Sequence, residues 1–456
     1  MDNRFSRLFN LTEEQAIEIL DGPANDSDEA SGRYIAASHL VNFDSDAAIA
    51  SLIRAVNNDD PDLDNRIVRR KAMESLGRLK VKSALPVIQA CLGDEDAYLV
   101  ENAAWALSEI GTDDTATLEK LAEQLERPEQ SYRTLIHAIA SLNYKPAAKR
   151  IEKFTTSDKA PISSAALTAL YRLTGDDQAI PQVMKYLQST NVNARRGSIQ
   201  DLIDAGYYRA IPHIARCPVS SVFRLRAIKS LAKSGIEEGK LTFAQVQPIV
   251  EKVLRDHPKD VAMVHTYDQV LDVKLLVQEL YGTDFGRCYL ATQALIENHA
   301  EAAPDAMKAS YEAEGYNDYG ANYHIMRLFG WLKVASAYDL LVEALHNKAP
   351  QFQKSRTAAA IALGELGEAR AIPELKKALS FPIWELQYAS LMALAALDVH
   401  IKRTDAGLLQ LETGLPRDTD LDAENFSEIH GLNEPEINAL NSAESDWLVQ
   451  EKLKAM

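Results

Sequence analysis

The sequence predicts an all-α protein in which antiparallel helix pairs stack into a curved superhelix. The main observation is an internal repeat of the form V/I-x-x-x-A-x-x-x-L-x-x-L/I-G, which is loosely held along the chain. Its anchor positions recur every 29 to 32 residues at Leu76, Leu107, Ile139, Leu170, Leu202 and Leu231, and Leu363 and Leu394 repeat the spacing later. Self-similarity at such a period is typical of a helical repeat array.

A second helix is expected between successive anchors, for example in residues 83–94, 178–189 and 370–381. Each of these segments has a proline near its start, where the missing N–H of proline would be unpaired in any case. The anchor helices are rich in alanine, as in 355–367, which permits close approach between layers. Two short helices per repeat predict a HEAT-like α-solenoid, in which each pair buries its apolar stripe only by stacking on its neighbours.

The solenoid is expected to be interrupted once, because residues 237–285 are helical in period but match the repeat poorly. After about residue 400 the chain becomes rich in Asp, Glu and Asn, which is typical of a solvated segment. The predicted parts are an N-terminal helical cap at 1–29, HEAT-like repeats at 30–236, an irregular helical connector at 237–285, further HEAT-like repeats at 286–400, and an acidic tail or C-terminal cap at 401–456.

Composition excludes several classes of function. The net charge of −17 argues against nucleic acid as the main partner, since phosphate binding needs an excess of Lys and Arg. No run approaches the roughly 18 apolar residues of a membrane span, and no secretory signal is visible, so membrane insertion is not expected and the cytoplasm is the expected location. The three cysteines lie far apart without a CxxC pair, which predicts neither a metal site nor a disulfide framework.

The strongest candidate site is the segment EGYNDYGANYHIMRLFGWLK, residues 314–333. Treated as a helix over 318–332, one face continues the core pattern with Ala321, Ile325, Leu328 and Leu332. The opposite face carries Tyr319, Tyr323, Met326 and Gly330, flanked by Asn322 and Arg327. That face is expected to line the inner curve of the solenoid. Aromatic rings beside a gap left by glycine would suit a flat, conjugated ligand.

Several side chains of this candidate site have two interpretations. Asp318 either caps the helix, as Asp often does, or aims its carboxylate at a ligand. Arg327 is either solvated or paired with a ligand carboxylate. Trp105 lies in the equivalent helix of an earlier repeat, where it either packs in the core or reaches the ligand. His324, at the margin of the core stripe, is expected to be structural, and Cys288 is expected to be buried and inert.

Four segments carry a resemblance to a known family. RYIAASHLVNF (33–43), NRIVRRKAMESLGRLK (65–80), CLGDEDAYLVENAAWALSEIGT (91–112) and YNDYGANYH (316–324) resemble the E/F-type phycobilin lyases over nearly the whole chain. The most similar subgroup is the single-chain phycoerythrin lyases and lyase-isomerases of cyanobacteria. The resemblance implies a bilin lyase that attaches phycoerythrobilin by a thioether to a cysteine of a phycoerythrin subunit, expected to be the α subunit.

The resemblance also implies roles for residues. The bilin is the substrate, no cofactor is implied, and the attacking thiol belongs to the partner subunit, so the enzyme positions the bilin and assists its protonation. The expected catalytic residues are Asp318 and Tyr319, and the expected bilin-binding residues are Tyr316, Tyr323, Asn322, Arg327, Arg287 and Trp105. Some relatives also convert phycoerythrobilin to phycourobilin, and the Asn-His-Cys motif of certain isomerases is absent here. A non-catalytic HEAT-repeat scaffold, or a bilin carrier or chaperone, remains the alternative.

Overall fold

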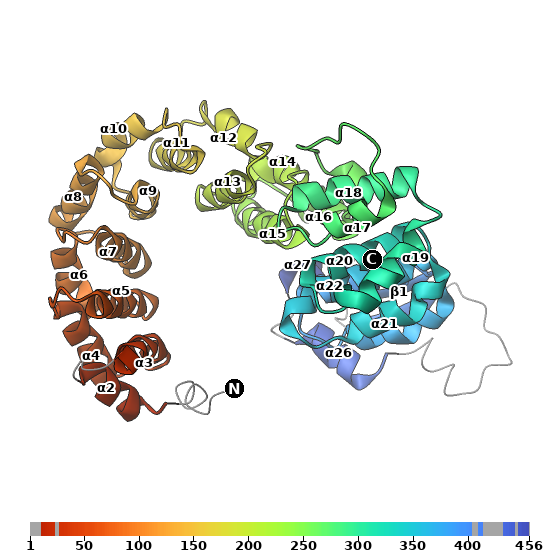
Figure 1. Ribbon diagram of the computed structural model, residues 1–456, viewed down its shortest axis with the longest axis horizontal. Helices are drawn as coiled ribbons and strands as arrows, with labels where there is room; N and C mark the ends of the chain where they lie inside the picture. The colour runs from red at the N-terminus through yellow and green to blue at the C-terminus, as the bar shows by residue number, and fades with distance from the viewer. Residues whose placement is uncertain (1–10, 23–26, 404–408, 414–431, 443–445, 456) are drawn as a thin grey trace. The chain divides into compact units, whose positions relative to one another are not determined.

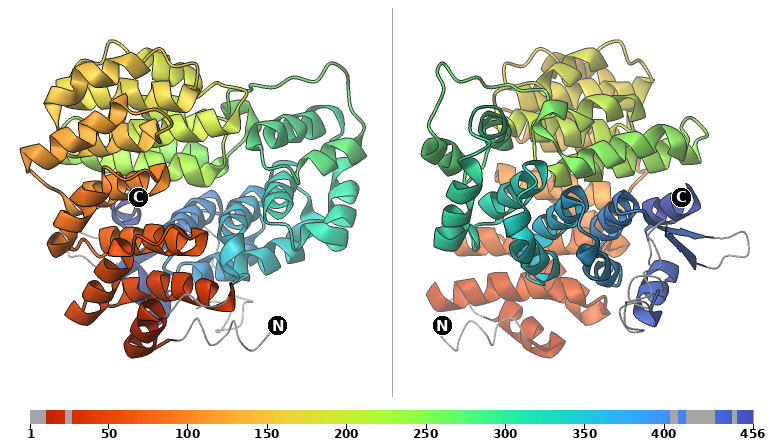
Figure 2. Two further views of the ribbon diagram at one scale, coloured as in Figure 1. Left: turned by 60° about the vertical axis from the view of Figure 1, so that its left-hand side comes forward. Right: turned by 90° about the vertical axis from the view of Figure 1, so that its right-hand side faces the viewer.

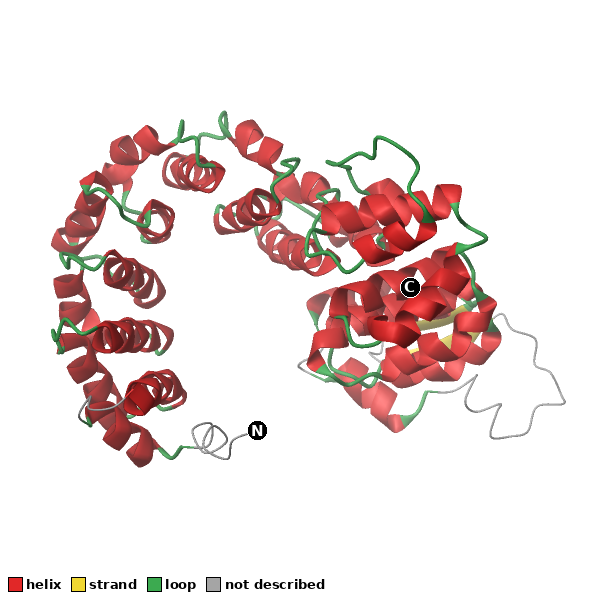
Figure 3. Cartoon of the chain, viewed as in Figure 1, coloured by secondary structure: helices red, strands yellow, loops and turns green. Residues whose placement is uncertain are grey.

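The computed structural model describes residues 11–22, 27–403, 409–413, 432–442 and 446–455. The chain divides into two compact units, residues 1–183 and 184–456 (Figure 1). Helices dominate both units (Figure 3), which confirms the predicted all-α, HEAT-like class. None of the described helices combines the length and the apolar composition that crossing a membrane would need.

The first unit consists of short helices in antiparallel pairs. The second helix of a pair often begins with proline in its first turn, as predicted for 83–94. The helices are α2 (Glu13–Asp21), α3 (Ser27–His39), α4 (Asp46–Asn57), α5 (Leu63–Arg78), α6 (Leu85–Cys91), α7 (Ala97–Ile110), α8 (Thr115–Glu123), α9 (Tyr132–Ser141), α10 (Ala148–Ile151), α11 (Ala160–Thr174) and α12 (Ile180–Tyr186), the last of which spans the boundary between the units.

The second unit continues the helix pairs and ends in a small hairpin. Its helices are α13 (Val192–Asp204), α14 (Ile211–Ala215), α15 (Ser221–Glu237), α16 (Phe243–Arg255), α17 (Val273–Glu279), α18 (Phe285–Asn298), α19 (Ala303–Ser310), α20 (Tyr319–Trp331), α21 (Tyr338–His346), α22 (Gln353–Leu366), α23 (Ile372–Ala378), α24 (Trp384–Ala396), α26 (Glu434–Asn441) and α27 (Trp447–Ala455). A π-helical turn at Tyr311–Gly315 precedes α20.

Two strands were not predicted. β1 (Val399–Arg403) pairs antiparallel with β2 (Leu409–Thr413), with Val399 opposite Thr413. In β1 the apolar Val399 and Ile401 are buried and alternate with polar residues, which is the period of a half-buried strand. Because an isolated hairpin is only marginally stable, the packing of β1 against α24 and α27 is what holds it. Residues 414–431 of the predicted acidic segment, and 1–10 of the predicted N-terminal cap, lie outside the described residues.

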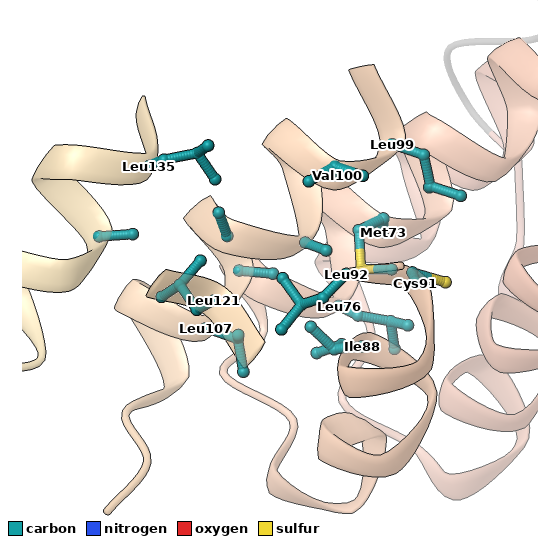
Figure 4. Packing of buried hydrophobic residues seen from close by; sticks show 14 of the residues in the cluster. Met73, Leu76, Ile88, Cys91, Leu92, Leu99, Val100, Leu107, Leu121 and Leu135 are labelled. Carbon is teal, nitrogen blue, oxygen red and sulfur yellow. The ribbon is translucent and has the colours of Figure 1, made fainter. Parts of the chain in front are cut away.

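The anchor residues of the repeat form the core. All of them are buried except Leu170, which is partly buried against the same cluster. Figure 4 shows this packing in the first unit, where Leu76 of α5 and Leu107 of α7 lie close to Ile88 and Leu121 from the second helices of their pairs. The sequence spacing therefore located the buried stripe correctly.

Successive anchor helices approach each other closely at glycine. A Cβ atom on Gly364 of α22 would lie 2.7 Å from Cα of Ala393 in α24, and one on Gly330 of α20 would lie 2.8 Å from Cα of Ala362 in α22. Gly77 of α5 meets Ala106 of α7 in the same way. α20, α22 and α24 accordingly pack in a row (Figure 2). The predicted ligand gap at Gly330 is therefore wrong, because the next helix fills that space.

We expect Gly364→Ala to lower the free energy of unfolding by about 1–3 kcal/mol, because the new methyl group overlaps the backbone of Ala393 and the helices must separate. Urea denaturation measures the change. Gly32→Ala in α3 is the control, since its Cβ would lie 3.6 Å from the nearest atom, in Ile19, and alanine favours the helix. Equal effects of the two substitutions would contradict close packing at Gly364.

Candidate functional site

Asp318 begins α20, the helix on which the sequence analysis placed the site. Its Oδ1 accepts hydrogen bonds from the backbone N–H groups of Gly320 at 2.8 Å and Ala321 at 2.7 Å. The expected helix cap is thus confirmed. Its second oxygen, Oδ2, forms no hydrogen bond within the described part of the chain. One oxygen therefore caps the helix while the other is available to a ligand.

Asp318 also lines a cleft of about 470 Å³ in the second unit. This volume lies within the usual range for small-molecule sites. We call it the Asp318 cleft, and its chemically informative lining residues are Arg196, Phe223, Phe285, Asp318, Tyr319 and Lys354. Tyr319 is 52% exposed and Phe223 is 38% exposed, so two aromatic rings are open to an incoming molecule. The cleft offers a carboxylate, two cations and flat apolar surfaces.

Lys354 lies in a cage of aromatic rings beside this cleft. Its Nζ is 4.4 Å from the ring centroid of Phe285, 4.9 Å from that of Tyr319 and 5.1 Å from that of Tyr323. Among the residues described, its ammonium forms neither an ion pair nor a hydrogen bond. Burial lowers the pKa of Lys354 to about 8, although Cys288, Asp318 and Asp256 act in the opposite direction. Holding the charged Lys354 ammonium at this position therefore lowers the free energy of unfolding.

We expect Lys354→Met to raise the free energy of unfolding at pH 7 by about 1–3 kcal/mol, since each unit of pKa depression corresponds to about 1.4 kcal/mol and the lost contacts with the rings offset part of this gain. Between about pH 8 and 10.5 the unfolded chain holds a proton on Lys354 that the folded chain has lost, so wild-type stability rises with pH. The advantage of the variant should therefore shrink over that interval.

Urea denaturation at pH 7 and at pH 10 measures this difference. Lys348→Met, at an exposed lysine outside the cleft, is the matched control and should change stability little at either pH. A Lys354→Met advantage that stays constant with pH would show that the burial of the ammonium is not its source.

A buried polar network lies beneath the cleft and centres on Asp256. Asp256 accepts hydrogen bonds from Arg224 and from Tyr323, and the hydroxyl of Tyr289 lies 2.8 Å from its Oδ2. The hydroxyls of Tyr323 and Ser221 are 2.9 Å apart. Burial, with the charge of Asp256, raises the pKa of both tyrosines well above the ordinary value. The network ties α15, the end of α16, α18 and α20 together.

The predicted open face of α20 is wrong except at Tyr319. Every residue from Gly320 to Gly330 is buried, and Tyr323 and Met326 are as inaccessible as the core stripe. The reason is that α20 packs against α18 as well as α22. Tyr323 therefore directs its hydroxyl into the Asp256 network, and Asn322 is buried with its Nδ2 donating to the carbonyl of Tyr316 at 3.4 Å.

Two of the expected bilin-binding cations already have a carboxylate neighbour within the chain. Arg327 is fully buried, donates from Nη1 to the carbonyl of Ala358 at 3.4 Å, and lies 3.7 Å from Glu365. It is neither solvated nor within reach of the cleft surface, so the predicted pairing with a ligand carboxylate is wrong. Arg287 is exposed but makes two hydrogen bonds to Glu279, at 2.9 and 2.8 Å, and neither residue lines the cleft.

The remaining expected residues are scattered. Tyr316 is 56% exposed but is not among the residues that line the cleft. Trp105 belongs to the first unit, where it packs on α5 near Gly77 in the edge of the core. His324 is fully buried, as expected for a structural residue, and burial lowers its pKa well below the ordinary value, so it is neutral. Of the predicted set, the structure places Asp318 and Tyr319 together in the cleft.

The three cysteines are free and buried. Burial raises the pKa of the Cys217 and Cys288 thiols to about 12, so neither is a thiolate near neutral pH. This confirms the expectation that Cys288 is inert. In the part of the chain that the structure describes, no three His, Cys, Asp or Glu side chains gather into a possible metal site. The chain therefore presents no activated thiol of its own.

Two family models match the repeats of this chain. A family profile described as HEAT repeats matches residues 62–143, and one described as PBS lyase HEAT-like repeat matches residues 355–381. The complex of CpcE and CpcF of phycocyanin lyase from Nostoc sp. PCC7120 contains a chain that is 27% identical, with a TM-score of 0.47, covering 54% of this chain and 95% of that chain.

Two relatives match across most of their length. The chain is 57% identical over 394 residues to "Uncharacterized phycocyanin operon protein Y" of Pseudanabaena tenuis (strain PCC 7409), covering 86% of this chain and 94% of that protein. It is 30% identical over 392 residues to bilin biosynthesis protein CpeY of Synechococcus sp. (strain WH8020), covering 83% and 93% respectively. A phycocyanobilin lyase subunit alpha of Nostoc sp. is 30% identical over 236 residues, covering 48% and 84%. On this evidence the chain belongs to the E/F-type family of HEAT-repeat bilin lyases.

Proposed function

We propose that this bilin lyase attaches phycoerythrobilin through a thioether to a cysteine of a phycoerythrin subunit, the α subunit in the first instance. The observation that carries the proposal is the Asp318 cleft, in which a carboxylate oxygen that has no partner among the described residues lies beside exposed aromatic rings. Its volume suits a small conjugated molecule. Support for phycoerythrobilin comes from the family resemblance of YNDYGANYH, and the relative CpeY, a bilin biosynthesis protein, supports a bilin more generally.

The reaction needs no nucleophile from the lyase. The sulfur of the acceptor cysteine forms a bond to the ethylidene carbon of the bilin, the thiol proton ends on the tetrapyrrole, and no group leaves. Such an addition requires that the bilin be held near the acceptor thiol and that a proton be moved. Buried, protonated cysteines in the lyase fit this scheme, because they cannot compete for the bilin.

Asp318 and Tyr319 are the residues proposed to act on the bilin. The Asp318 carboxylate would accept charge-assisted hydrogen bonds from pyrrole N–H groups and keep the tetrapyrrole protonated. Tyr319, half exposed at the rim, would stack on a ring and supply a hydroxyl proton. Isomerisation requires that a proton leave one carbon of the bilin and arrive at another, and a carboxylate beside a phenol can move such a proton. Phycourobilin would be the product of this second step.

Co-expression with a bilin supply and a phycobiliprotein subunit tests the proposal. Phycoerythrobilin and phycocyanobilin are each combined with phycoerythrin α and with phycocyanin α, because one relative is named after a phycocyanin operon. Colour on phycoerythrin α that survives acid–urea denaturation is the expected result. An absorption maximum shifted to shorter wavelength would show that the attached bilin has also been isomerised. Covalent colour on phycocyanin α alone would overturn the subunit assignment, and reversible colour alone would indicate a carrier.

A further inference from the structure

Two cations line the Asp318 cleft without a carboxylate partner in the described part of the chain, Lys354 and Arg196. Among the described residues, the contacts of the Lys354 ammonium are those with the rings of its aromatic cage. Arg196 lies 5.3 Å above the ring of Phe223, donates from Nη2 to the carbonyl of Thr283 at 3.2 Å, and has a buried Nε without a partner. Each cation is therefore positioned by an aromatic face, with N–H donors left over.

Lys354 and Arg196 are partly buried, and a cation that is partly removed from water is stabilised by a counter-charge. The neighbouring arginine shows the usual solution: Arg195 is fully buried and forms an ion pair with Asp284. Asp284 directly follows Thr283, whose carbonyl Arg196 contacts. Of two consecutive arginines, one is thus neutralised by a carboxylate and the other is left facing the cleft. This difference indicates that the missing counter-charge is supplied from outside the chain.

The chemistry of the cleft specifies the ligand further. Two cations with free N–H donors suit two carboxylates, and the rings of Phe223 and Tyr319 suit a flat body between them. Asp318 is the acidic residue among those lining the cleft, so the ligand must also offer donors to a carboxylate. A polyanion without donors would be repelled by Asp318. A flat, conjugated dicarboxylate with N–H groups meets all three requirements.

We propose that Lys354 and Arg196 form a paired-cation site that recognises the two carboxylates of such a ligand, each cation binding one. This inference rests on the proposed function, under which the carboxylates are the two propionates of the bilin. It replaces Arg327, which is fully buried with Glu365 as its carboxylate neighbour, and Arg287, which is ion-paired with Glu279. Neither residue was singled out by sequence, because each stands at the beginning of an ordinary repeat helix.

Binding of phycoerythrobilin and of its dimethyl ester, without any acceptor subunit, tests the proposal. Both are titrated by absorbance into the wild-type full-length chain and into Lys354→Gln and Arg196→Gln. The wild type should prefer the free acid by on the order of 100-fold, since each charge-assisted contact is worth about tenfold or more. Each variant should lose about tenfold in affinity for the free acid and little for the ester, and Lys354→Arg should recover part of the loss.

Lys348→Gln and Arg226→Gln remove exposed cations that do not line the cleft, and they should bind like the wild type. The proposal is overturned if the wild type binds acid and ester equally or binds neither. It is also overturned if the cleft variants lose both ligands alike, which would mark a structural role. Failure of the proposed function looks different: the preference for the acid would persist while no covalent product forms on any phycobiliprotein subunit.

Discussion

Asp318→Asn is expected to lower the rate of bilin transfer at least 100-fold while leaving the fold intact. An asparagine caps a helix about as well as an aspartate does, so the hydrogen bonds from Gly320 and Ala321 to Oδ1 can persist. What the substitution removes is the negative charge and the ability to take up a proton. Because general acid–base groups contribute about 10²–10⁴-fold, the loss should appear in the transfer rate rather than in stability.

The measurement follows covalent colour on the acceptor subunit over time, together with the helical circular dichroism and the melting temperature of the lyase. Asp114→Asn is the matched control, because Asp114 caps α8 through a hydrogen bond from Thr117 at 2.9 Å and lies in the first unit. The control should transfer bilin normally. Transfer at the wild-type rate by Asp318→Asn would establish that Asp318 is a helix cap and nothing more.

The fold was predictable because the apolar residues that define it recur at a regular spacing in the sequence. A buried position that recurs about every 31 residues marks the anchor helices, and the buried Leu76, Leu107 and Leu363 confirm it. The β-hairpin was missed although Val399 and Ile401 alternate with polar residues, because five residues of alternation are a weak signal within a helical chain. Local composition suggested an acidic tail or a terminal cap there, and the contacts with α24 and α27 could not be anticipated.

The candidate site was predictable only in part. Helical phase correctly grouped Tyr323, Met326 and Gly330 on one face of α20, but phase does not tell whether another helix covers that face. In this protein α22 does so at Gly330. Lys354 and Arg196 could not be found, since they come from helices far apart in sequence and each resembles an ordinary solvated residue. Their significance comes from the fact that neither cation forms an ion pair among the described residues of the cleft, which only the assembled unit reveals.

Asp256→Asn is expected to lower the free energy of unfolding by about 3–5 kcal/mol, the largest change in stability predicted for this chain. Asp256 is the counter-charge of the fully buried Arg224, and removing one member of a buried pair leaves the other uncompensated. Asparagine tolerates the left-handed backbone that Asp256 adopts at φ +49°, so the substitution adds no strain there. Urea denaturation measures the effect, and Asp260→Asn, which breaks a partly exposed ion pair with Lys252, should cost at most about 1 kcal/mol.

The double variant Arg224→Met with Asp256→Asn separates the two possible sources of this loss. If the uncompensated guanidinium is the main cost, the double variant should be more stable than Asp256→Asn alone. A double variant that is equally unstable would instead assign the cost to the lost hydrogen bonds of Tyr289 and Tyr323.

The network also positions the cleft, because Phe223, Phe285 and Tyr319 lie on α15, α18 and α20, the helices that it ties together. Asp256→Asn should therefore weaken binding of the bilin free acid and of its dimethyl ester alike, whereas substitutions at Lys354 and Arg196 should affect the free acid alone.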